Sequence, residues 1–425
     1  MRILISGITY HPRFDGQAIF MTNLAEGLAK RGHQVTVVYP SSEGPAIRRE
    51  LNGVQLQGVR SIHMAFLHPD LFVPTLSVKA IRKIFNISQP EIVHIQDHYP
   101  LSRLTMHEAE KRGIKIIGTN HFMPENLAQY IPGVTKITPI YNRALWSWML
   151  DSYNRMELVT AQSRAAANLI RSKGLKPPVL PVSCGIDLGR FRWDASIDRL
   201  ACRERYELDP KRTLFLYVGR IEKDKRIDVL LHALAHLKRD DIQLVIAGRG
   251  SASEYFHALA KTLHLGGRVR FTGFIPKEDL HVLLNSVDIF SMPSDAELLS
   301  LASLEAMACG RPMLLADAVA LPELVVPGVN GYLFKPNDAV DAAHYMQKLA
   351  DQPERWKDMG RASLEKAKIH SLENTVLRYE DIYKKSLEEI PVITSPAARP
   401  VGLEIDGVEP SLSSQESALR RRGKR

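Results

Sequence analysis

The sequence predicts an α/β protein with two parallel-sheet domains that face each other across a cleft. Short apolar runs alternate with helical patterns along most of the chain, as in parallel sheets whose strands are joined through helices. This alternation restarts in the second half, after a stiff proline turn at Gly174 to Pro178. With 425 residues, the chain is also long enough for two domains that each have a core.

The first domain is expected over residues 1–176. Its strands are expected where short apolar runs occur, at 3–6, 35–38, 92–95, 114–117 and 158–161. Helical patterns lie between some of these runs, at 18–31 and 144–155. Continuous apolar runs bounded by polar segments favour the buried strands of a parallel sheet.

The second domain is expected over residues 177–371 and repeats the pattern. Strands and helices are expected, in chain order, at 213–218, 228–239, 244–247, 253–264, 269–271, 289–290 and 313–316. A last helix is expected at 372–388. Residues 391–425 are rich in Pro, Ser and charge, which predicts a disordered tail.

The net charge of +9 is concentrated in the first domain, where residues 1–175 carry 20 Lys and Arg against 12 Asp and Glu. This excess indicates either an anionic partner surface or an ordinary solvated domain. No nucleic-acid-binding motif accompanies it, so no nucleic-acid partner is expected and an anionic bilayer is the better candidate. No apolar run has the length of a membrane span, and the three cysteines lie far apart. A cytoplasmic protein is expected, with peripheral association at the inner face of the plasma membrane as an open addition.

A cationic loop, Val218 to Arg226, follows an apolar strand and precedes an expected helix. Cations at this point suit a diphosphate. Negative charge grows on a leaving diphosphate during group transfer, so fixed cations stabilise the transition state more than the ground state. A solvated basic loop is the alternative interpretation.

A second polar segment, Ser294 to Pro312, places Glu297 in a loop and Glu305 eight residues later in a short helix. Ser300 is expected to cap that helix, which should stop before Gly310. A free helix N-terminus offers N–H groups to an anion. A carboxylate one turn inside can accept hydrogen bonds from vicinal hydroxyls, so phosphates, a ribose and a second polyol would satisfy the segment. A surface loop with an ordinary amphipathic helix is the alternative.

This segment resembles the glutamate pair of the family 4 retaining glycosyltransferases, which have the GT-B fold. Phe290 to Ser294 before it and Ala320 to Phe334 after it strengthen the resemblance, which covers residues 1–388. It implies two Rossmann-like domains, a last helix that crosses back onto the first domain, and transfer of a hexose from a nucleotide diphosphate sugar to an acceptor hydroxyl. The segments 94–101 and 120–126 are similar to bacterial glycolipid-forming members, the diacylglycerol glucosyltransferases and phosphatidylinositol mannosyltransferases.

The resemblance also implies roles for individual residues. Arg220 and Lys225, with Gly219, match the family's phosphate clamp, whereas Lys223 matches less well. Glu297 is assigned to the hydroxyls of the donor sugar near the reacting carbon, and Glu305 to the ribose. Front-face retention, in which the departing phosphate oxygen takes the acceptor proton, is favoured over a covalent intermediate on Glu297.

The resemblance assigns His121 to the donor sugar, where its side chain would bind a hydroxyl. Its backbone carbonyl would stabilise positive charge at the anomeric carbon. A structural histidine is the alternative.

Further donor contacts are implied at loops that follow strands. Gly16 lies where the family often has a glycine pair, although Asp15 replaces one of the two. Phe274 and Ile275 follow a turn whose backbone holds the nucleobase in the family, with plain turn chemistry as the alternative. Leu299 and Ser300 are further implied donor contacts. Leu298, Leu299 and Ser300 lie where the family often has Gly-Phe-Gly, and Leu298 and Leu299 are expected to reshape the sugar pocket.

Two segments favour a lipid acceptor of the diacylglycerol type. Tyr141 to Leu150 combines aromatic, apolar and basic residues on an expected helix, and Ile62 to Val73 is an apolar loop. Either segment could instead belong to a core. The alternatives to a lipid acceptor are a soluble saccharide or small polyol, or a catalytically inactive scaffold that binds the nucleotide sugar.

No cofactor and no metal ion are expected. The cations of the loop already match a diphosphate, and no Asp-x-Asp cluster lies in a suitable loop. The expected donor is a UDP-hexose rather than GDP-mannose. The expected partners are this donor and an anionic membrane surface with its lipid acceptor, and the oligomeric state stays open.

Overall fold

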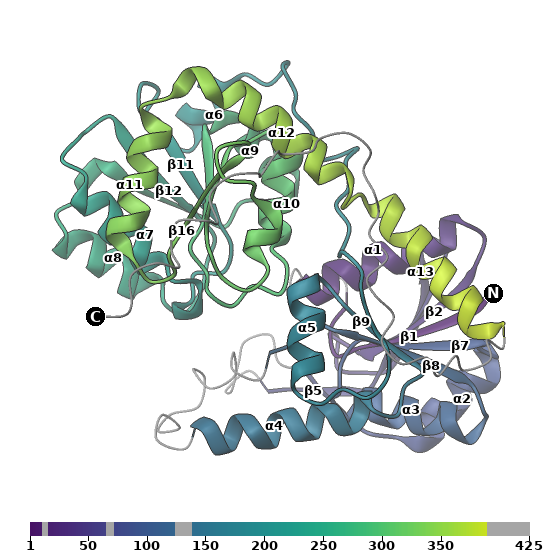
Figure 1. Ribbon diagram of the computed structural model, residues 1–425. Coiled ribbons are helices and arrows are strands. Elements are labelled where there is room, and N and C mark those ends of the chain that lie inside the picture. The colour runs from purple at the N-terminus through teal and green to yellow at the C-terminus, as the bar shows by residue number, and fades with distance from the viewer. Residues whose placement is uncertain (11–15, 65–71, 124–137, 389–425) are drawn as a thin grey trace, which may run out of the picture. The chain divides into compact units, whose positions relative to one another are not determined.

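The computed structural model describes residues 1–10, 16–64, 72–123 and 138–388. Residues Met1–Glu388 form one compact unit. This unit contains two mainly parallel sheets with helices on both faces, so the predicted α/β fold is confirmed (Figure 1). The tail expected at 391–425, Asp15 and most of the apolar loop between Ile62 and Val73 lie outside the described residues.

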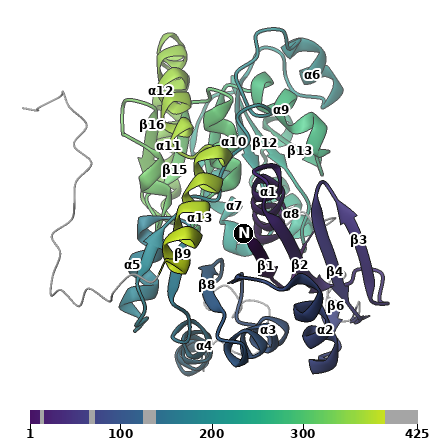
Figure 2. The same cartoon turned by 90° about the vertical axis from the view of Figure 1, so that its right-hand side faces the viewer.

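Within the described residues the first sheet has eight strands, in the order β10-β9-β8-β7-β1-β2-β4-β3. The strands are β1 (Arg2–Ser6), β2 (Gln34–Pro40), β3 (Ile47–Leu51), β4 (Val54–Val59), β7 (Ile92–Ile95), β8 (Lys115–Asn120), β9 (Leu158–Ala161) and β10 (Val179–Pro181). All neighbouring pairs are parallel except β3 and β4. Strands β1 and β7 are almost wholly buried, as a sheet covered on both faces requires. Figure 2 shows the polar strand β3 at the opposite edge from β9.

Helices cover both faces of the first sheet. Figure 1 shows α1 (Gly16–Lys30) and α13 (Leu372–Leu387) on one face. It shows α2 (Val78–Ser88), α3 (Pro100–Lys111) and α4 (Thr138–Tyr153) on the other. Helix α5 (Arg164–Ser172) packs against β9 and β10, and a small hairpin joins β5 (Ser61–His63) to β6 (Phe72–Pro74).

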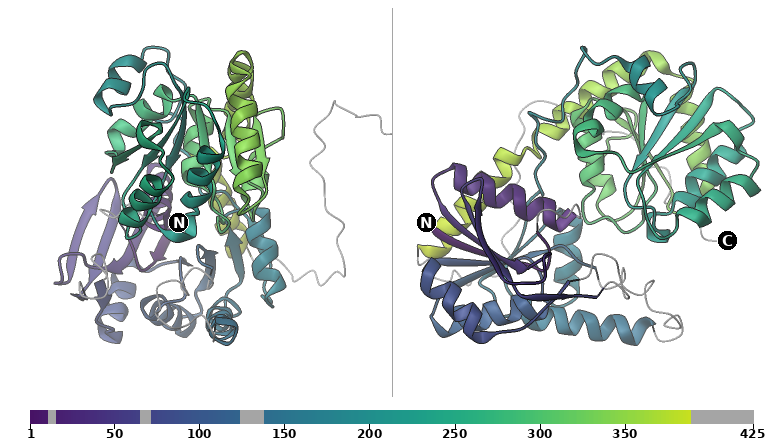
Figure 3. Two further views of the ribbon diagram at one scale, coloured as in Figure 1. Left: turned by 90° about the vertical axis from the view of Figure 1, so that its left-hand side faces the viewer. Right: turned by 180° about the vertical axis from the view of Figure 1, so that it is seen from behind.

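The last helix, α13, packs beside α1, as Figure 3 shows from behind. Two buried tyrosines on α13 bond to side chains of the first sheet. The Tyr383 hydroxyl lies 2.7 Å from Nδ1 of His94, and the Tyr379 hydroxyl lies 2.8 Å from Oγ1 of Thr160 and 3.1 Å from Oγ1 of Thr119. The C-terminal end of the described chain is therefore tied to the first sheet by hydrogen bonds.

The first sheet extends past residue 176, the predicted end of the first domain. Strand β10 pairs in parallel with β9, and the Val182 N–H donates to the carbonyl of Ala161. The proline turn that suggests the boundary is a short connection from α5 to β10, after which the chain leaves the sheet.

The second sheet has six strands within the described residues, in the order β13-β12-β11-β14-β15-β16. They are β11 (Thr213–Val218), β12 (Ile242–Ala247), β13 (Val269–Gly273), β14 (Ile289–Met292), β15 (Met313–Ala316) and β16 (Gly331–Phe334). All pairs are parallel. The loops after these strands therefore gather at one edge, which is where open α/β sheets bind ligands.

Helices also cover both faces of the second sheet (Figures 1 and 3). One face carries α7 (Ile227–His236), α8 (Ser253–Thr262) and α11 (Ala339–Ala350). The other carries α6 (Arg199–Arg205), α9 (Lys277–Ser286), α10 (Leu301–Ala308) and α12 (Trp356–Lys368).

Candidate active site

One side-chain and one backbone hydrogen bond hold the cationic loop after β11 in place. The buried Tyr217 hydroxyl donates to the carbonyl of Arg220 (2.7 Å), and the Gly219 N–H donates to the carbonyl of Ala247 (3.0 Å). Lys223–Lys225 forms a 3₁₀ turn, and Arg226 then adopts a left-handed conformation (φ +52°) before α7 begins. The loop thus turns sharply at the ligand-binding edge of the sheet.

Lys225 and Glu297 form the central ion pair of the site. Nζ of Lys225 lies 2.7 Å from Oε1 of Glu297, and the two side chains are 15% and 14% exposed. The residues come from the loops after β11 and β14, which are neighbouring strands. Nζ also lies 3.6 Å from Oδ2 of Asp224, a side chain that is itself buried.

The protonation of Lys225 follows from these contacts. Burial disfavours the charged ammonium, but the carboxylates of Glu297 and Asp224 outweigh burial and raise the pKa of Lys225 above its usual value. The ammonium group therefore stays charged at neutral pH. A fixed cation at this point is what an entering diphosphate requires.

The other two cations of the loop differ in their surroundings. Arg220 is 57% exposed and lies 3.8 Å from Oδ2 of Asp224, so its guanidinium can still reach a ligand. Lys223 instead lies over the ring of Tyr255, with 5.0 Å between Nζ and the ring centre. Within this loop, Lys225 and Arg220 are joined through Asp224, and Lys223 is directed elsewhere.

A second ion-pair cluster beside the site was missed from the sequence. Arg226 pairs with Asp228 (3.0 Å) and with Asp295 (3.4 Å), and it also bonds to the side chain of Asn337. Asp295 lies two residues before Glu297, so the cluster ties the carboxylate loop to the start of α7. The signal in the sequence is an Arg directly after the clamp lysine and an Asp two residues before the glutamate.

Helix α10 begins as the sequence predicts. Ser300 is its N-cap, and its hydroxyl accepts from the N–H of Ser303 (3.2 Å). Glu305 lies one turn inside the helix and is half-buried. Leu298 and Leu299 just before the cap are both buried, so apolar side chains fill the space in which the family often has glycines.

The loops after β11, β12 and β13 approach closely. A Cβ atom on Gly248, whose φ is +147°, would lie 1.8 Å from the carbonyl oxygen of Gly219, so no side chain fits there. The Gly248 N–H donates to the carbonyl of Gly273 (2.8 Å). Phe274 after that turn is exposed and lies 4.8 Å from the guanidinium carbon of Arg249, whereas Ile275 is buried. The requirement for glycine at 248 was not recognised from the sequence.

His121 follows β8 in the first sheet, and both of its ring nitrogens have partners. Nε2 lies 2.8 Å from Oε1 of Gln96, and Nδ1 lies 2.5 Å from Nε2 of Gln162. An amide NH2 can only donate, so His121 carries its proton on Nε2 and donates to Gln96. Burial lowers the pKa of His121 to about 3, which keeps the imidazole neutral. A sugar hydroxyl would have to replace one of these two partners.

Gly16 is the first residue of α1, and a Cβ atom added to it would have open space around it. Next to it, Gln17 donates to Oδ2 of the buried Asp97 (3.0 Å), which also accepts from the N–H of Ile8 (2.6 Å). Burial raises the pKa of Asp97 despite these donors. Asp97 thus connects the ends of β1 and β7, a role that its position in the sequence did not reveal.

Helix α4, which is expected to have an interfacial face, packs much of its apolar surface into the core. Trp146, Met149 and Leu150 are buried there, and Trp148 is 36% exposed. For these three buried side chains the core alternative is the correct one, because α4 covers one face of the first sheet.

Comparison with known proteins gives two family matches. The model described as "Glycosyltransferase Family 4" matches residues 14–190, and the model described as "Glycosyl transferases group 1" matches residues 198–366. Together they match most of the chain, and each covers most of one sheet with its helices.

Similar proteins were found in several organisms. D-inositol 3-phosphate glycosyltransferase 2 of Catenulispora acidiphila is 32% identical over 254 residues, which are 57% of this chain and 58% of that protein. An uncharacterized glycosyltransferase of Methanocaldococcus jannaschii is 26% identical over 410 residues, 91% of this chain and 99% of that protein.

Two solved structures show the same fold. Sucrose-phosphate synthase from Thermosynechococcus elongatus has 21% identity and a TM-score of 0.73, over 90% of this chain and 98% of that chain. Anabaena HepE in complex with UDP-glucose has 16% identity and a TM-score of 0.72, over 90% of this chain and 99% of that chain.

Proposed function

The chain belongs to the GT-B glycosyltransferases, and from this premise we propose that it is a retaining hexosyltransferase that uses a nucleotide diphosphate sugar. The observation that carries the proposal is the pair formed by Lys225 and Glu297, with Arg220 beside it. It combines cations for a diphosphate with a carboxylate for sugar hydroxyls at one edge of a parallel sheet.

The proposed reaction exchanges one bond at the anomeric carbon. The bond from this carbon to the leaving phosphate oxygen breaks, and a bond to the acceptor oxygen forms on the same face. The acceptor proton passes to the departing phosphate oxygen. Arg220 and Lys225 stabilise the charge that grows on the diphosphate, which acts on the transition state more than on the bound substrate.

The remaining contacts are assigned by position. Glu297 would hold the donor sugar and Glu305 the ribose, with the N-terminal amides of α10 near the phosphates. His121 is neutral, so a role through its backbone carbonyl or as a hydrogen-bonding group suits it better than that of a cation. The backbone after Gly273, next to the exposed Phe274, is assigned to the base.

We favour a UDP-hexose as the donor. Anabaena HepE, which shares the fold, has been solved with UDP and with UDP-glucose. Backbone contacts to a base leave little signal in side chains, so the choice between uridine and guanosine has to be measured.

We favour a diacylglycerol-type lipid as the acceptor because of a basic apolar face on the first domain. Ile62 and Val73 are cross-strand partners in the β5–β6 hairpin, and both are exposed. Leu76 and Val78, which follow the hairpin in the chain, and Ile87 on α2 are also exposed. The exposed basic residues of this region are Arg60, Lys79, Arg82 and Lys83.

This combination of apolar and basic side chains suits an anionic bilayer surface. No helix within the described residues is long and apolar enough to cross a bilayer. Peripheral association through the basic apolar face would bring the acceptor lipid to the first domain. In flotation with phosphatidylglycerol vesicles at low salt, Lys79→Gln/Lys83→Gln should bind more weakly than the wild-type protein.

The decisive experiment measures transfer from UDP-glucose, UDP-galactose and GDP-mannose, each with and without vesicles that contain diacylglycerol. A glycolipid formed from a UDP-hexose, with the anomeric configuration of the donor retained, supports the proposal. An inverted product would overturn the proposed mechanism. Nucleotide binding without turnover on any acceptor would overturn the assignment as an active enzyme.

A soluble polyol acceptor is the second candidate, and the name of the Catenulispora relative favours it, since that protein is called a D-inositol 3-phosphate glycosyltransferase. Assays with inositol phosphates and no lipid test this candidate directly. Turnover that needs no vesicles would replace the lipid acceptor with the soluble one and keep the rest of the proposal.

A further inference from the structure

Glu323 belongs to the second domain, and its carboxylate binds the start of a helix of the first domain. It lies in a 3₁₀ turn, Leu321–Leu324, that follows β15 within the compact unit Met1–Glu388. Its Oε1 accepts from the N–H of Ala165 (2.6 Å), and its Oε2 accepts from the N–H of Arg164 (3.2 Å). These are the first two residues of α5. The contact therefore joins a turn of the second domain to a helix of the first.

The contact completes the N-terminal cap of α5. The N–H groups in the first turn of a helix have no partner inside the helix and need one from outside. Ser163, the N-cap, accepts from the N–H of Ala166 (3.0 Å), and Glu323 accepts from the two N–H groups before it. The helix dipole also favours a carboxylate at this end. The start of α5 is therefore fixed by a residue of the other domain.

The start of α5 also positions His121. Gln162 lies two residues before Arg164, and its side-chain amide donates to Nδ1 of His121 (2.5 Å). Two residues span at most about 7 Å of chain, so a shift of the helix start is passed on to this amide. Glu323 is therefore connected to His121 by a short path through the backbone of the first domain.

The turn that carries Glu323 is also tied to the loop of Glu297. The N–H of Ala320, just before the turn, donates to the carbonyl of Glu297 (3.2 Å). Leu298 is buried in the core cluster of the first domain, and Val319 packs against the same cluster. Val319 has a φ of +48°, which is a costly conformation for a β-branched residue and persists only where its surroundings hold it. The loop and the turn therefore contact the first domain together.

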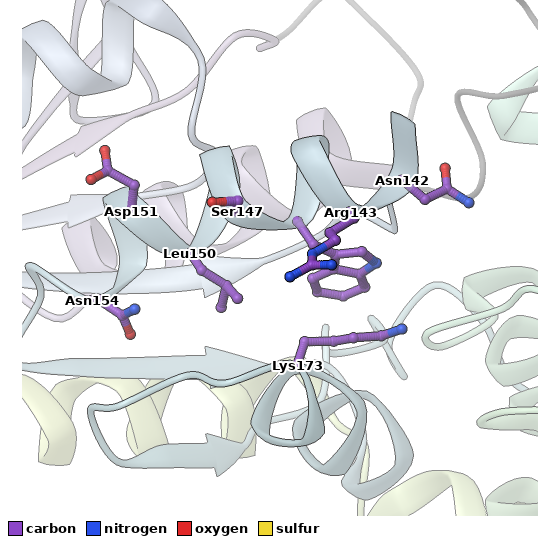
Figure 4. A pocket seen from close by; sticks show the side chains of 8 residues that line it. Asn142, Arg143, Ser147, Leu150, Asp151, Asn154 and Lys173 are labelled. Carbon is purple, nitrogen blue, oxygen red and sulfur yellow. The ribbon is translucent and has the colours of Figure 1, made fainter. Parts of the chain in front are cut away.

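The two ends of α5 differ in their neighbours. A pocket of about 670 Å³ lies between α4 and the carboxyl end of α5. Figure 4 shows Lys173, which follows α5, across this pocket from Arg143 and Leu150 of α4. At its other end α5 is held directly by Glu323. The position of the helix start therefore depends on Glu323 rather than on close packing of the whole helix against α4.

We propose that Glu323 is a positioning residue that sets His121 of the first domain against Glu297 of the second. It acts on His121 through the start of α5 and the amide of Gln162. It acts on Glu297 through the hydrogen bond of Ala320. The inference rests on the proposed transferase, in which His121 and Glu297 both contact the donor sugar. A misplacement of about 1 Å at such contacts can cost about 100-fold in rate.

The test compares three substitutions of Glu323 in the full chain. Glu323→Ala removes the contact and should lower kcat by about 10 to 100-fold while the Kd for UDP stays within about three-fold, because only the geometry of the site changes. Glu323→Asp keeps the charge but is shorter by one methylene, so it should lose nearly as much activity. Glu323→Gln keeps the length and one acceptor oxygen, so its kcat should stay within about five-fold of the wild-type value. This order separates the reach of the side chain from its charge.

A second measurement does not depend on turnover. In ¹⁵N NMR, Glu323→Ala should move the Nδ1 resonance of His121 toward its position in Gln162→Met, which removes the hydrogen bond outright. The matched control is Asp198→Ala, because Asp198 caps α6 by accepting from two N–H groups, each at 3.0 Å. This control loses the same kind of cap within the second domain, so it should keep the wild-type resonance and the wild-type kcat.

The proposal is overturned if Glu323→Ala leaves the Nδ1 resonance unmoved, if Asp198→Ala moves it equally, or if the kcat of an active wild-type protein survives the loss of Glu323. Should Glu323→Ala fail to fold, the other two variants decide. A resonance that moves in Glu323→Asp and stays in Glu323→Gln supports the proposal, and the reverse order overturns it. A wild-type protein without any transfer would overturn the proposed transferase, and the NMR comparison would still test the link from Glu323 to His121.

Discussion

Lys225 and Glu297 meet at 2.7 Å between Nζ and Oε1, at the ends of two adjacent strands of the second sheet. Both side chains are largely removed from water, and although burial disfavours the ammonium, the carboxylates of Glu297 and Asp224 raise the pKa of Lys225 and keep it charged. A diphosphate that enters beside this pair would share the lysine with the carboxylate. The structure therefore links the group proposed to bind the leaving phosphate to the group proposed to bind the sugar.

Replacing either partner should slow transfer strongly, but for different reasons. Glu297→Gln should lower kcat by about 100-fold or more and leave the Kd for the nucleotide within about three-fold, since the amide keeps the shape and loses the charge. Lys225→Met should lower kcat by about 100 to 1,000-fold and also weaken nucleotide binding, because it removes a cation from the diphosphate. Initial rates and calorimetric titration with UDP measure both effects.

A double-mutant cycle on unfolding checks the ion pair itself. The double variant should lose less free energy of unfolding than the sum of the losses in the two single variants. The difference, which is the coupling energy of the pair, should be about 0.5–3 kcal/mol. A coupling near zero would show that the pair is not formed in solution. Lys223→Met is the matched control, since Lys223 lies on Tyr255 outside the ion pair.

The fold could be predicted largely because buried parallel strands leave an unambiguous apolar pattern. Strands β1, β9, β11 and β15 lie where apolar runs predict them, and α13 begins at the predicted Leu372. The hairpin β5–β6 and the antiparallel edge strand β3 were not predicted. Their residues are mixed in polarity because one side faces water, and such segments resemble loops in sequence.

The sequence allowed prediction only of those site residues that lie in loops directly after strands. Arg220, Lys225 and Glu297, which the family resemblance assigns to one site, lie close together because they follow adjacent strands. The amide partners of His121 could not be foreseen, because Gln96 and Gln162 are separated by 66 positions in the chain and meet only through the order of β7, β8 and β9. Single-sequence patterns carry no information on such long-range pairing.

The hydrogen bond from Gln162 to Nδ1 of His121 predicts which tautomer of His121 is present. It also predicts what happens to catalysis when this hydrogen bond is removed. In the wild-type protein, ¹⁵N NMR of the imidazole should show the neutral Nε2–H form across pH 6 to 8, consistent with a pKa lowered by burial to about 3. Gln162→Met should lower kcat by about 10 to 100-fold with little change in KM, because a misplaced group costs rate rather than binding. An NMR spectrum of an imidazolium at pH 7 would contradict the arrangement.

The hydrogen bond between the Tyr383 hydroxyl and His94 predicts the contribution of α13 to stability. Tyr383→Phe should lower the free energy of unfolding by about 1–3 kcal/mol, because Nδ1 of His94 is left buried without a partner. Urea unfolding at pH 7.5 measures the loss. The double variant His94→Phe/Tyr383→Phe removes both partners and should recover part of it. If the double variant is as unstable as the sum of the single variants, the hydrogen bond does not couple the two residues.

The burial of His98 should make the free energy of unfolding depend on pH. Its ring is 1% exposed, and both ring nitrogens are without a partner in the described structure. Aromatic rings surround it, with centroid distances of 4.8 Å to Tyr99 and 4.7 Å to Trp148. Burial lowers the pKa of His98 to about 4, and the charge of Arg103 adds to this effect.

Between pH 6.5 and 4 the unfolded chain therefore binds a proton at His98 that the folded protein does not. The free energy of unfolding must fall as the pH falls through this range, by up to about 1.4 kcal/mol per pH unit from this residue. His98→Phe should remove that part of the slope and leave stability at pH 7.5 unchanged or higher, because no hydrogen bond is lost. Urea unfolding at pH 5.0, 5.5, 6.0 and 7.5 measures the slope. Trp148→Phe alters the same cluster without removing a titratable group, so it should shift stability equally at every pH, and an equal change of slope in both variants would rule out His98 as the source.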